Sequence, residues 1–285
     1  MPLTADPAVS SRPASQASPS SVTRAMQILR VMSEGRNLRL TDIAKATGYD
    51  KTTVLRLLEN LIQEGFVQRN TENKQFSLGP ELTLLGAAAL KRFDPRPSVR
   101  PSLLRLVGKF EDSVVLSIPM GLESSCIDLE EGCYPIRANY LRIGSRRPLG
   151  VGAGSLALLA WLPEDEREAA FEALAPTWAK YQGISVPLLK DCIASAQERG
   201  YVVLLDAVVQ RMGGIAVPIF EPSGRPVAAL SIAALSERIS GREKELGQEL
   251  IREALKCQVR WADASHLSEK AEKHTTAQRK KGGQS

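Results

Sequence analysis

The sequence predicts an α+β protein with two folded domains, and three observations support this prediction. Residues 40–78 follow the order helix, tight turn, helix and short two-stranded hairpin that is typical of a winged helix-turn-helix. From Ser98 onward, apolar helices alternate with strands joined by hairpin turns, which indicates a mixed α/β domain with a mainly antiparallel sheet. A length of 285 residues is also typical of two domains.

Changes in composition and pattern predict the boundaries along the chain. We expect a disordered leader at 1–19, a winged helix-turn-helix at 20–79, a linker helix at 80–94, a second domain at 95–262 and a disordered basic tail at 263–285. The leader is rich in Ser, Pro and Ala and lacks the apolar core of a secretion signal. The sequence has no run of about eighteen apolar residues, so we expect a cytoplasmic protein with no membrane partner.

The net charge of +5 is concentrated on the predicted helix-turn-helix and on the tail. Residues 21–78 carry nine Lys and Arg against six Asp and Glu, and residues 265–285 carry five against two. The long middle of the chain is close to neutral. This distribution is expected if the partner is a nucleic acid, because its phosphates attract basic surfaces.

The second helix of the motif carries the clearest pattern. Its apolar face has helical spacing and consists of Val54, Leu57, Leu58, Leu61 and Ile62. Asp50 stands where an N-cap is expected, and Gly65 stands where a C′ glycine is expected.

Two further helices are expected before it. Thr41 is the predicted cap of the nearer one, and Gly48 supplies the left-handed turn that follows. The predicted buried residues of this helix are Leu40, Ile43 and Ala44. The first helix ends near Gly35, and its predicted apolar face is Val22, Ala25, Met26, Leu29 and Met32.

The residues just after the Asp50 cap would enter the major groove of DNA. Arg56 could reach a guanine edge or a phosphate, whereas Lys51 and the threonine hydroxyls suit phosphates. The predicted DNA-binding residues are Thr41, Lys51, Thr52, Thr53, Arg56, Arg69 and Lys74, the last two from the wing. The alternative is a small helical protein-interaction domain with a solvated basic face.

A stripe of Leu and Ala follows the break at Gly79 and Pro80 and runs from Glu81 to Leu90. A helix here would join the two domains. Its apolar stripe favours pairing with a second copy of the chain, in a homodimer or a dimer of dimers. Packing against its own chain alone is the alternative.

The second domain is expected to open with a helix from Ser98 to Phe110. Strands are predicted at Val114–Ile118, Ser124–Leu129, Ile136–Tyr140, Tyr201–Leu205, Gly214–Phe220 and Val227–Ala233. Further helices are predicted at Ser155–Leu162, Pro163–Leu174 and Val186–Arg199, with a closing helix from a Ser240 cap to about residue 260. A glycine-rich loop, Gly144–Gly154, precedes the first of these helices.

Little in the sequence suggests metal or catalytic chemistry. The cysteines, Cys126, Cys133, Cys192 and Cys257, are scattered, and both histidines, His266 and His274, fall in the tail. We therefore expect no metal, no cofactor, no catalytic residue and mostly buried, reduced cysteines. A nucleotide-binding enzyme built on Gly150–Gly154 is a distant alternative, because no βαβ unit surrounds that loop.

The chain resembles the IclR family of bacterial transcription regulators over roughly residues 20–260. The resemblance rests on the helix-turn-helix, the wing ending in Phe-Ser-Leu-Gly-Pro, Ile143–Leu149, Gly152–Gly154, Glu198–Tyr201 and the strand pair GGIAVPIFEPSGRPVAALSIA. It implies a GAF-like effector-binding domain and dimers or dimers of dimers on operator DNA. It also implies a pocket between the sheet and the Gly-Ala-Gly helix start, for small organic acids or aromatic compounds.

Carried across by position, the resemblance implies effector-binding roles for Gly152, Ala153, Leu204, Met212, Gly214, Ser231 and Ala233. The helix start at Gly152 would attract a carboxylate. Members that bind very small acids often carry an acid in place of Leu204, a Cys in place of Gly214 and a second Ser in place of Ala233.

These departures remove polarity or bulk, so we expect a larger, more apolar effector such as an aromatic carboxylate. The alternative is a domain that no longer senses a ligand and serves only for oligomerisation. The sequence is compatible with a repressor and with an activator.

Overall fold

A computed structural model describes residues 19–34, 38–90, 94–137 and 142–258. The predicted tail, with His266 and His274, and nearly all of the predicted leader lie outside these residues. The chain divides into two compact units, Met1–Ala88 and Ala89–Ser285. Each unit has an apolar core of its own.

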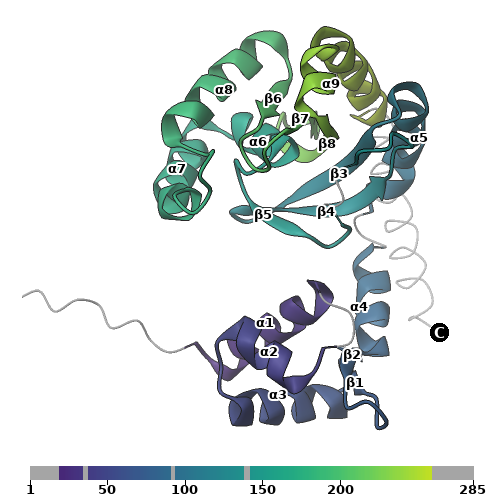
Figure 1. Cartoon of the computed structure of the whole chain (residues 1–285), viewed down its shortest axis with the longest axis vertical. Helices are drawn as coiled ribbons and strands as arrows, with labels where there is room; N and C mark the ends of the chain where they lie inside the picture. Colours follow the sequence, from purple (N-terminus) through teal and green to yellow (C-terminus); the bar gives the residue numbers. More distant parts are fainter. Residues whose placement is uncertain (1–18, 35–37, 91–93, 138–141, 259–285) are drawn as a thin grey trace, which may run out of the picture. The chain divides into compact units, whose positions relative to one another are not determined.

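The N-terminal unit consists of three helices and a hairpin (Figure 1). Its elements are α1 (Ser21–Glu34), α2 (Leu40–Thr47), α3 (Lys51–Gln63), β1 (Val67–Arg69) and β2 (Phe76–Leu78). The strands pair antiparallel, and a bridge between Leu38 and Phe76 joins the segment before α2 to the hairpin. These elements confirm the predicted winged helix-turn-helix.

The limits of α3 are as predicted because its end signals are local. The Asp50 carboxylate accepts a 2.8 Å hydrogen bond from the Thr53 N–H. Hydrogen bonds from the side chain and backbone of Thr53 lower the pKa of Asp50. Gly48 and Gly65 both have φ of +73°, the left-handed conformation expected at the turns. The predicted apolar face of α3 is buried, apart from Ile62, which is half-buried.

The predicted cap of α2 is wrong. Arg39 occupies the N-cap position, and Thr41 lies exposed inside the first turn. The Asp42 carboxylate accepts a 2.9 Å hydrogen bond from the Arg39 N–H, so this end is stabilised from inside the helix rather than by a threonine hydroxyl. Leu40 is half-buried against the core rather than fully buried.

The predicted apolar face of α1 is also partly wrong. Val22 and Met26 are 66% and 45% exposed, whereas Ile28 is fully buried. All three fit a helical repeat, and only the packing of α2 and α3 decides which of them is covered.

The helix α4 (Pro80–Leu90) contains the boundary between the two units. Leu84 and Leu85 are 65% and 50% exposed in it. This helix is therefore apolar but largely uncovered in the described chain.

The C-terminal unit is built on a six-stranded sheet in the order β5-β4-β3-β8-β7-β6. Its strands are β3 (Ser113–Met120), β4 (Glu123–Glu130), β5 (Arg146–Pro148), β6 (Val202–Leu205), β7 (Met212–Phe220) and β8 (Pro226–Leu235). Every neighbouring pair is antiparallel, which confirms the predicted sheet type.

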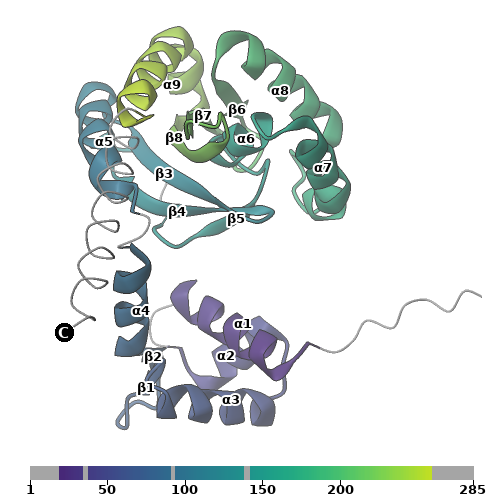
Figure 2. The same cartoon turned by 180° about the vertical axis from the view of Figure 1, so that it is seen from behind.

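Helices cover both faces of this sheet (Figures 1 and 2). One face is covered by α5 (Arg96–Phe110), α9 (Ser236–Ser240) and a helix at residues 243–258. The opposite face holds α6 (Ala153–Ala160), which also packs against α7 (Glu164–Trp178) and α8 (Val186–Arg199). All eight residues of α6 are buried. None of the helices within the described ranges is long and apolar enough to cross a membrane.

The predicted strand Ile136–Tyr140 is wrong where it is described. Residues 136–137 form no strand, and residues 138–140 lie outside the described residues. The outer strand on this side is β5, which lies inside the predicted glycine-rich loop. It forms because Arg146 and Arg147 find partners in β4, opposite Ser125 and Ser124.

Several helix ends also differ from the prediction. The helix predicted at Ser155–Leu162 is found at Ala153–Ala160, and the one predicted from Ser98 begins at Arg96. Ser240 ends α9, with its hydroxyl donating to the Glu237 carbonyl oxygen, and the closing helix begins only at residue 243. The helix predicted to end at Leu174 continues to Trp178. Of the cysteines, Cys126 and Cys257 are buried, Cys192 is half-buried and Cys133 is exposed.

A buried carboxylate joins α5 to the closing helix. The Glu253 side chain is 2% exposed and accepts hydrogen bonds from Arg105 Nε at 3.1 Å and Lys256 Nζ at 2.7 Å. Burial alone would raise the pKa of Glu253. Hydrogen bonds from Arg105, Lys256 and Ser102, with the charge of Arg105, outweigh burial and lower the pKa to about 2.

We expect Glu253→Gln to lower the free energy of unfolding by about 1–3 kcal/mol at neutral pH, because buried donors lose a charged acceptor. The folded pKa lies below the ordinary 4.5, so this stabilisation is complete above pH 4.5 and is lost as the pH falls toward 2. Denaturant unfolding of the full chain at neutral and acid pH measures it. Glu245→Gln, at a side chain 56% exposed on the same helix, is the control. A difference that does not depend on pH would contradict this account.

Candidate DNA-binding surface and ligand cavity

The N-terminal end of α3 presents exposed polar side chains on a rigid support. Lys51, Thr52 and Arg56 are exposed, and Thr52 and Arg56 share one face of the helix. Thr53 is half-buried and takes part in the cap with Asp50. Because the opposite face of α3 belongs to the core, the backbone that carries these exposed side chains is held in place.

The wing and the start of α2 add the other predicted residues, Thr41, Arg69 and Lys74, which are all exposed. The Arg69 guanidinium lies 5.4 Å from the centre of the Phe76 ring, which steadies it beside β2. Lys74 has φ of +58° at the wing turn, and its N–H donates to the Asn70 carbonyl oxygen. Arg39, an exposed cation just before α2, was not among the predicted residues.

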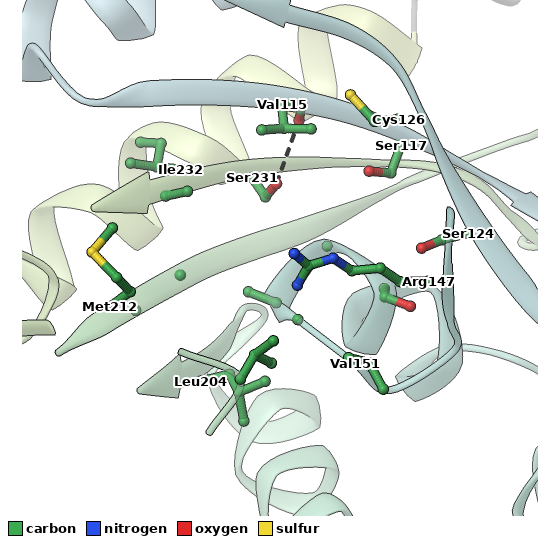
Figure 3. Close-up of a pocket in the computed structure, with 18 of the residues that line it drawn as sticks. Val115, Ser117, Ser124, Cys126, Arg147, Val151, Leu204, Met212, Ser231 and Ile232 are labelled. Atoms are coloured by element: carbon green, nitrogen blue, oxygen red, sulfur yellow. Dashed lines mark hydrogen bonds between the residues drawn. The ribbon is translucent and has the colours of Figure 1, made fainter. Parts of the chain in front are cut away.

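A cavity in the C-terminal unit lies between the sheet and the start of α6 (Figure 3). Its space, including the open mouth, is about 680 Å³. Strands β3, β4, β5, β7 and β8 line it, together with the end of β6 and the loop after it.

All seven residues that the resemblance carried across line this one cavity. They are Gly152, Ala153, Leu204, Met212, Gly214, Ser231 and Ala233. They come from four elements that are separate in sequence, and the fold brings them together. Their position is a property of the fold, whereas their part in binding is a proposal.

Further polar residues of the cavity, from β3, β4, β5 and the turn before β5, were not among the predicted site residues. These are Ser117, Ser124, Cys126, Ser145 and Arg147. Strand alternation could have placed Ser124 and Cys126 on a common face of the predicted Ser124–Leu129 strand. Arg147 lies in the matched segment Ile143–Leu149, but β5 was not predicted, so nothing indicated which of its two arginines faces the cavity.

Hydrogen bonds hold the segment between β5 and α6 in one position. The Trp178 indole N–H donates to the Leu149 carbonyl oxygen at 2.7 Å, and the Ser155 hydroxyl donates to that of Pro148 at 2.8 Å. Gly152, with φ of +97°, is the N-cap of α6 and has no side-chain oxygen to offer the first helical N–H groups. These groups border the cavity, and such a helix start attracts an anion.

Glycines bring α6 close to the sheet. A Cβ at Gly214 would lie 2.9 Å from the Ala153 Cβ, and a Cβ at Gly154 would lie 3.1 Å from Ser231 Oγ. The missing side chain at Gly214 therefore lets α6 approach β7 and does not widen the cavity, which corrects the steric argument made from the sequence. The other part of that argument is unchanged: Leu204 and Ala233 line the cavity with apolar side chains where polar ones were expected in members that bind very small acids.

The cavity thiol is neutral near pH 7. Burial first, and then the charge of Asp128, raises the pKa of Cys126 to about 11. Ser231 donates a 3.5 Å hydrogen bond to the Val115 carbonyl oxygen, drawn in Figure 3.

Two models of the same protein family match this chain, one in each unit. The family model described as the IclR helix-turn-helix domain matches residues 21–71. The model described as bacterial transcriptional regulator IclR C-terminal matches residues 87–259.

Proteins that are similar over most of this chain and most of their own length are transcription regulators. The regulator XynR of Escherichia coli is 32% identical over 236 residues, which cover 82% of this chain and 93% of XynR. The regulator KipR of Bacillus subtilis is 29% identical over 221 residues, 77% of this chain and 87% of KipR.

Solved structures share the fold. An IclR transcriptional regulator from Alicyclobacillus acidocaldarius has a TM-score of 0.70 at 24% identity, covering 84% of this chain and 98% of that one. An IclR homolog from Microbacterium hydrocarbonoxydans, complexed with 4-hydroxybenzoate, has a TM-score of 0.68 at 22% identity, covering 85% and 98%. At these identities the likeness establishes the fold alone.

We expect Gly214→Ala to lower the free energy of unfolding by about 1–3 kcal/mol, because the added methyl group meets Ala153. The double variant Ala153→Gly with Gly214→Ala moves the methyl group across the same contact and should recover part of this loss. Denaturant unfolding of the full chain measures both. If Gly214→Ala is as stable as the natural protein, the close approach of α6 to β7 does not constrain this position.

Proposed function

Since the chain belongs to the IclR family of bacterial transcription regulators, which bind DNA, we propose that it reads operator DNA with the N-terminal end of α3. Like its relatives, the protein is a transcription regulator and not an enzyme. In this proposal residues 20–79 form the DNA reader, 80–94 the linker and 95–262 the effector-binding domain.

The observation that carries the DNA-reading proposal is the exposed group at the α3 start. Arg56 lies one turn beyond Thr52 on the same exposed face, and its long side chain is assigned to a base edge or a phosphate. Lys51, Thr52 and Thr41 are assigned to phosphates. Thr53 has a smaller part, because it is half-buried in the cap with Asp50. Arg69 and Lys74 are assigned to the backbone or the minor groove beside the wing.

We expect Arg56→Ala to weaken operator binding by about tenfold to a hundredfold, because a good side-chain contact to a base is worth about 1–3 kcal/mol. Arg30→Ala removes an exposed cation from α1 and is the control for net charge. A gel-shift titration at fixed salt, on the site protected in a footprint of the upstream region, measures both. Equal binding by Arg56→Ala and the natural protein would remove Arg56 from the reading surface.

The C-terminal cavity is assigned to a small organic acid, with an aromatic carboxylate as the favoured class. Support comes from the helix start at Gly152 and from the apolar side chains Leu204 and Met212. The homolog from Microbacterium hydrocarbonoxydans holds 4-hydroxybenzoate, which is such an acid. A domain that serves only for oligomerisation is the competing proposal.

Effector binding is assumed in this proposal to affect the DNA reader through α4. Leu84 and Leu85 are exposed leucines in an apolar helix, and a second copy of the chain would cover them in a homodimer or a dimer of dimers. Effector binding would then change the spacing of two DNA readers. Such coupling is reciprocal, so operator DNA must change the effector affinity by the same factor.

We expect benzoate-type compounds to raise the thermal unfolding midpoint of the full chain. A ligand at a hundredfold its Kd stabilises the folded state by about 2.7 kcal/mol. Differential scanning fluorimetry with a broad panel of organic acids measures the shift, and matched primary amides are the control. No shift across the whole panel would favour the domain that serves only for oligomerisation.

A further inference from the structure

The cavity is divided into a polar part and an apolar part. Serines and the α6 start form the polar part, with Ser117, Ser124, Ser145 and Ser231. Leu204, Val208, Val209 and Met212 form the apolar part. Among the described residues that line the cavity, Arg147 alone carries a charge. Figure 3 shows its side chain extending between Ser124 on one side and Leu204 on the other.

Strand pairing decides that Arg147 faces the cavity. In β5 it pairs with Ser124 of β4, whose side chain also lines the cavity. Its neighbour Arg146 pairs with Ser125 and, by strand alternation, points to the opposite face. There Arg146 Nη1 lies 3.5 Å from a Glu123 carboxylate oxygen. Two adjacent arginines thus have different surroundings.

The backbone around Arg147 brings it to the α6 start. A Cβ at Gly152 would lie 3.6 Å from Arg147 Nη1, so the guanidinium is directly beside the N-cap of α6. Pro148 and Leu149, which follow Arg147, are both held by hydrogen bonds to their carbonyl oxygens. The backbone that follows Arg147 is thus held in place, and its guanidinium and the N-terminal end of α6 lie side by side; both favour an anion.

We propose that Arg147 is the residue that selects the charge of the ligand, and that the cavity takes an amphipathic acid with one anionic group. The acid group binds the Arg147 guanidinium at the α6 start, and the apolar body extends toward Leu204 and Met212. This inference rests on the proposed function, in which an organic acid occupies the cavity. It adds that Arg147 anchors the acid group and that the ligand carries only one charge.

The limit of one charge follows from the apolar part. A second carboxylate at the far end of a ligand would lie against Leu204, Val209 and Met212, none of which can donate a hydrogen bond. Burying an unpaired charge is costly, so a dicarboxylate should bind less well than the matching monocarboxylate. A neutral amide of the same shape loses the attraction to Arg147 and should also bind less well.

The test is calorimetric titration of the full chain with two matched series. Benzoate, benzamide and terephthalate form the aromatic series, and hexanoate, hexanamide and adipate form the aliphatic one. The variants are Arg147→Met, Arg147→Lys and the control Arg146→Met, each checked for folding by thermal unfolding. Arg146→Met removes an equal charge from the same strand on the opposite face.

We expect the better monocarboxylate to bind at least about tenfold more tightly than its amide and its dicarboxylate. Arg147→Met should abolish this preference over the amide, Arg147→Lys should retain part of it, and Arg146→Met should leave it unchanged.

If Arg147→Met does not fold, the assignment of Arg147 is decided by the ratio of acid affinity to amide affinity, measured for Arg147→Lys and for the natural protein. If acid and amide bind the natural protein equally, or if Arg147→Met keeps the preference, the assignment of Arg147 is overturned while ligand binding stands. If no compound binds the natural protein, the proposed effector function fails, and the assignment fails with it.

Discussion

The constraint on which the C-terminal unit depends is that α6 has no polar face. All eight of its residues, Ala153–Ala160, are buried, so the helix must be enclosed by the sheet on one side and by α7 and α8 on the others. Enclosure requires close approach to the sheet, which Gly154 and Gly214 permit. It also buries the start of the helix, whose first N–H groups need acceptors. A partly polar cavity at that end, able to hold water or an anion, follows from burying the helix.

Features set by neighbouring residues could be predicted from the sequence, as α3 illustrates. The Asp50 cap, the turns at Gly48 and Gly65 and the apolar repeat between them depend on residues within one or two turns. The face of α1 could not be predicted in the same way. Val22, Met26 and Ile28 are all apolar, and the choice among them depends on helices that come later in the chain.

The cavity also has one part that could be predicted from the sequence and one part that could not. Its half around α6, β7 and β8 could be located because the resemblance fixes those positions in order along the chain. The half that contains Arg147 depends on the pairing of β5 with β4, a register that no local pattern in a three-residue strand specifies. The effect of Gly214 could not be predicted either, because a missing side chain can open a space or let a neighbour move into it. Here Ala153 occupies that space.

The position of β5 at the outer edge of the sheet has a consequence for aggregation. Among the described strands it pairs only with β4, so its other side offers backbone groups to a strand of another molecule. The strand has only three residues, two arginines and a proline without an N–H group, and short, charged, proline-bearing edges resist such growth. Sequence changes that make β5 longer or more apolar, for instance to admit a neutral ligand, would therefore expose the protein to edge-to-edge association. Ligand preference and solubility are linked through the same three residues.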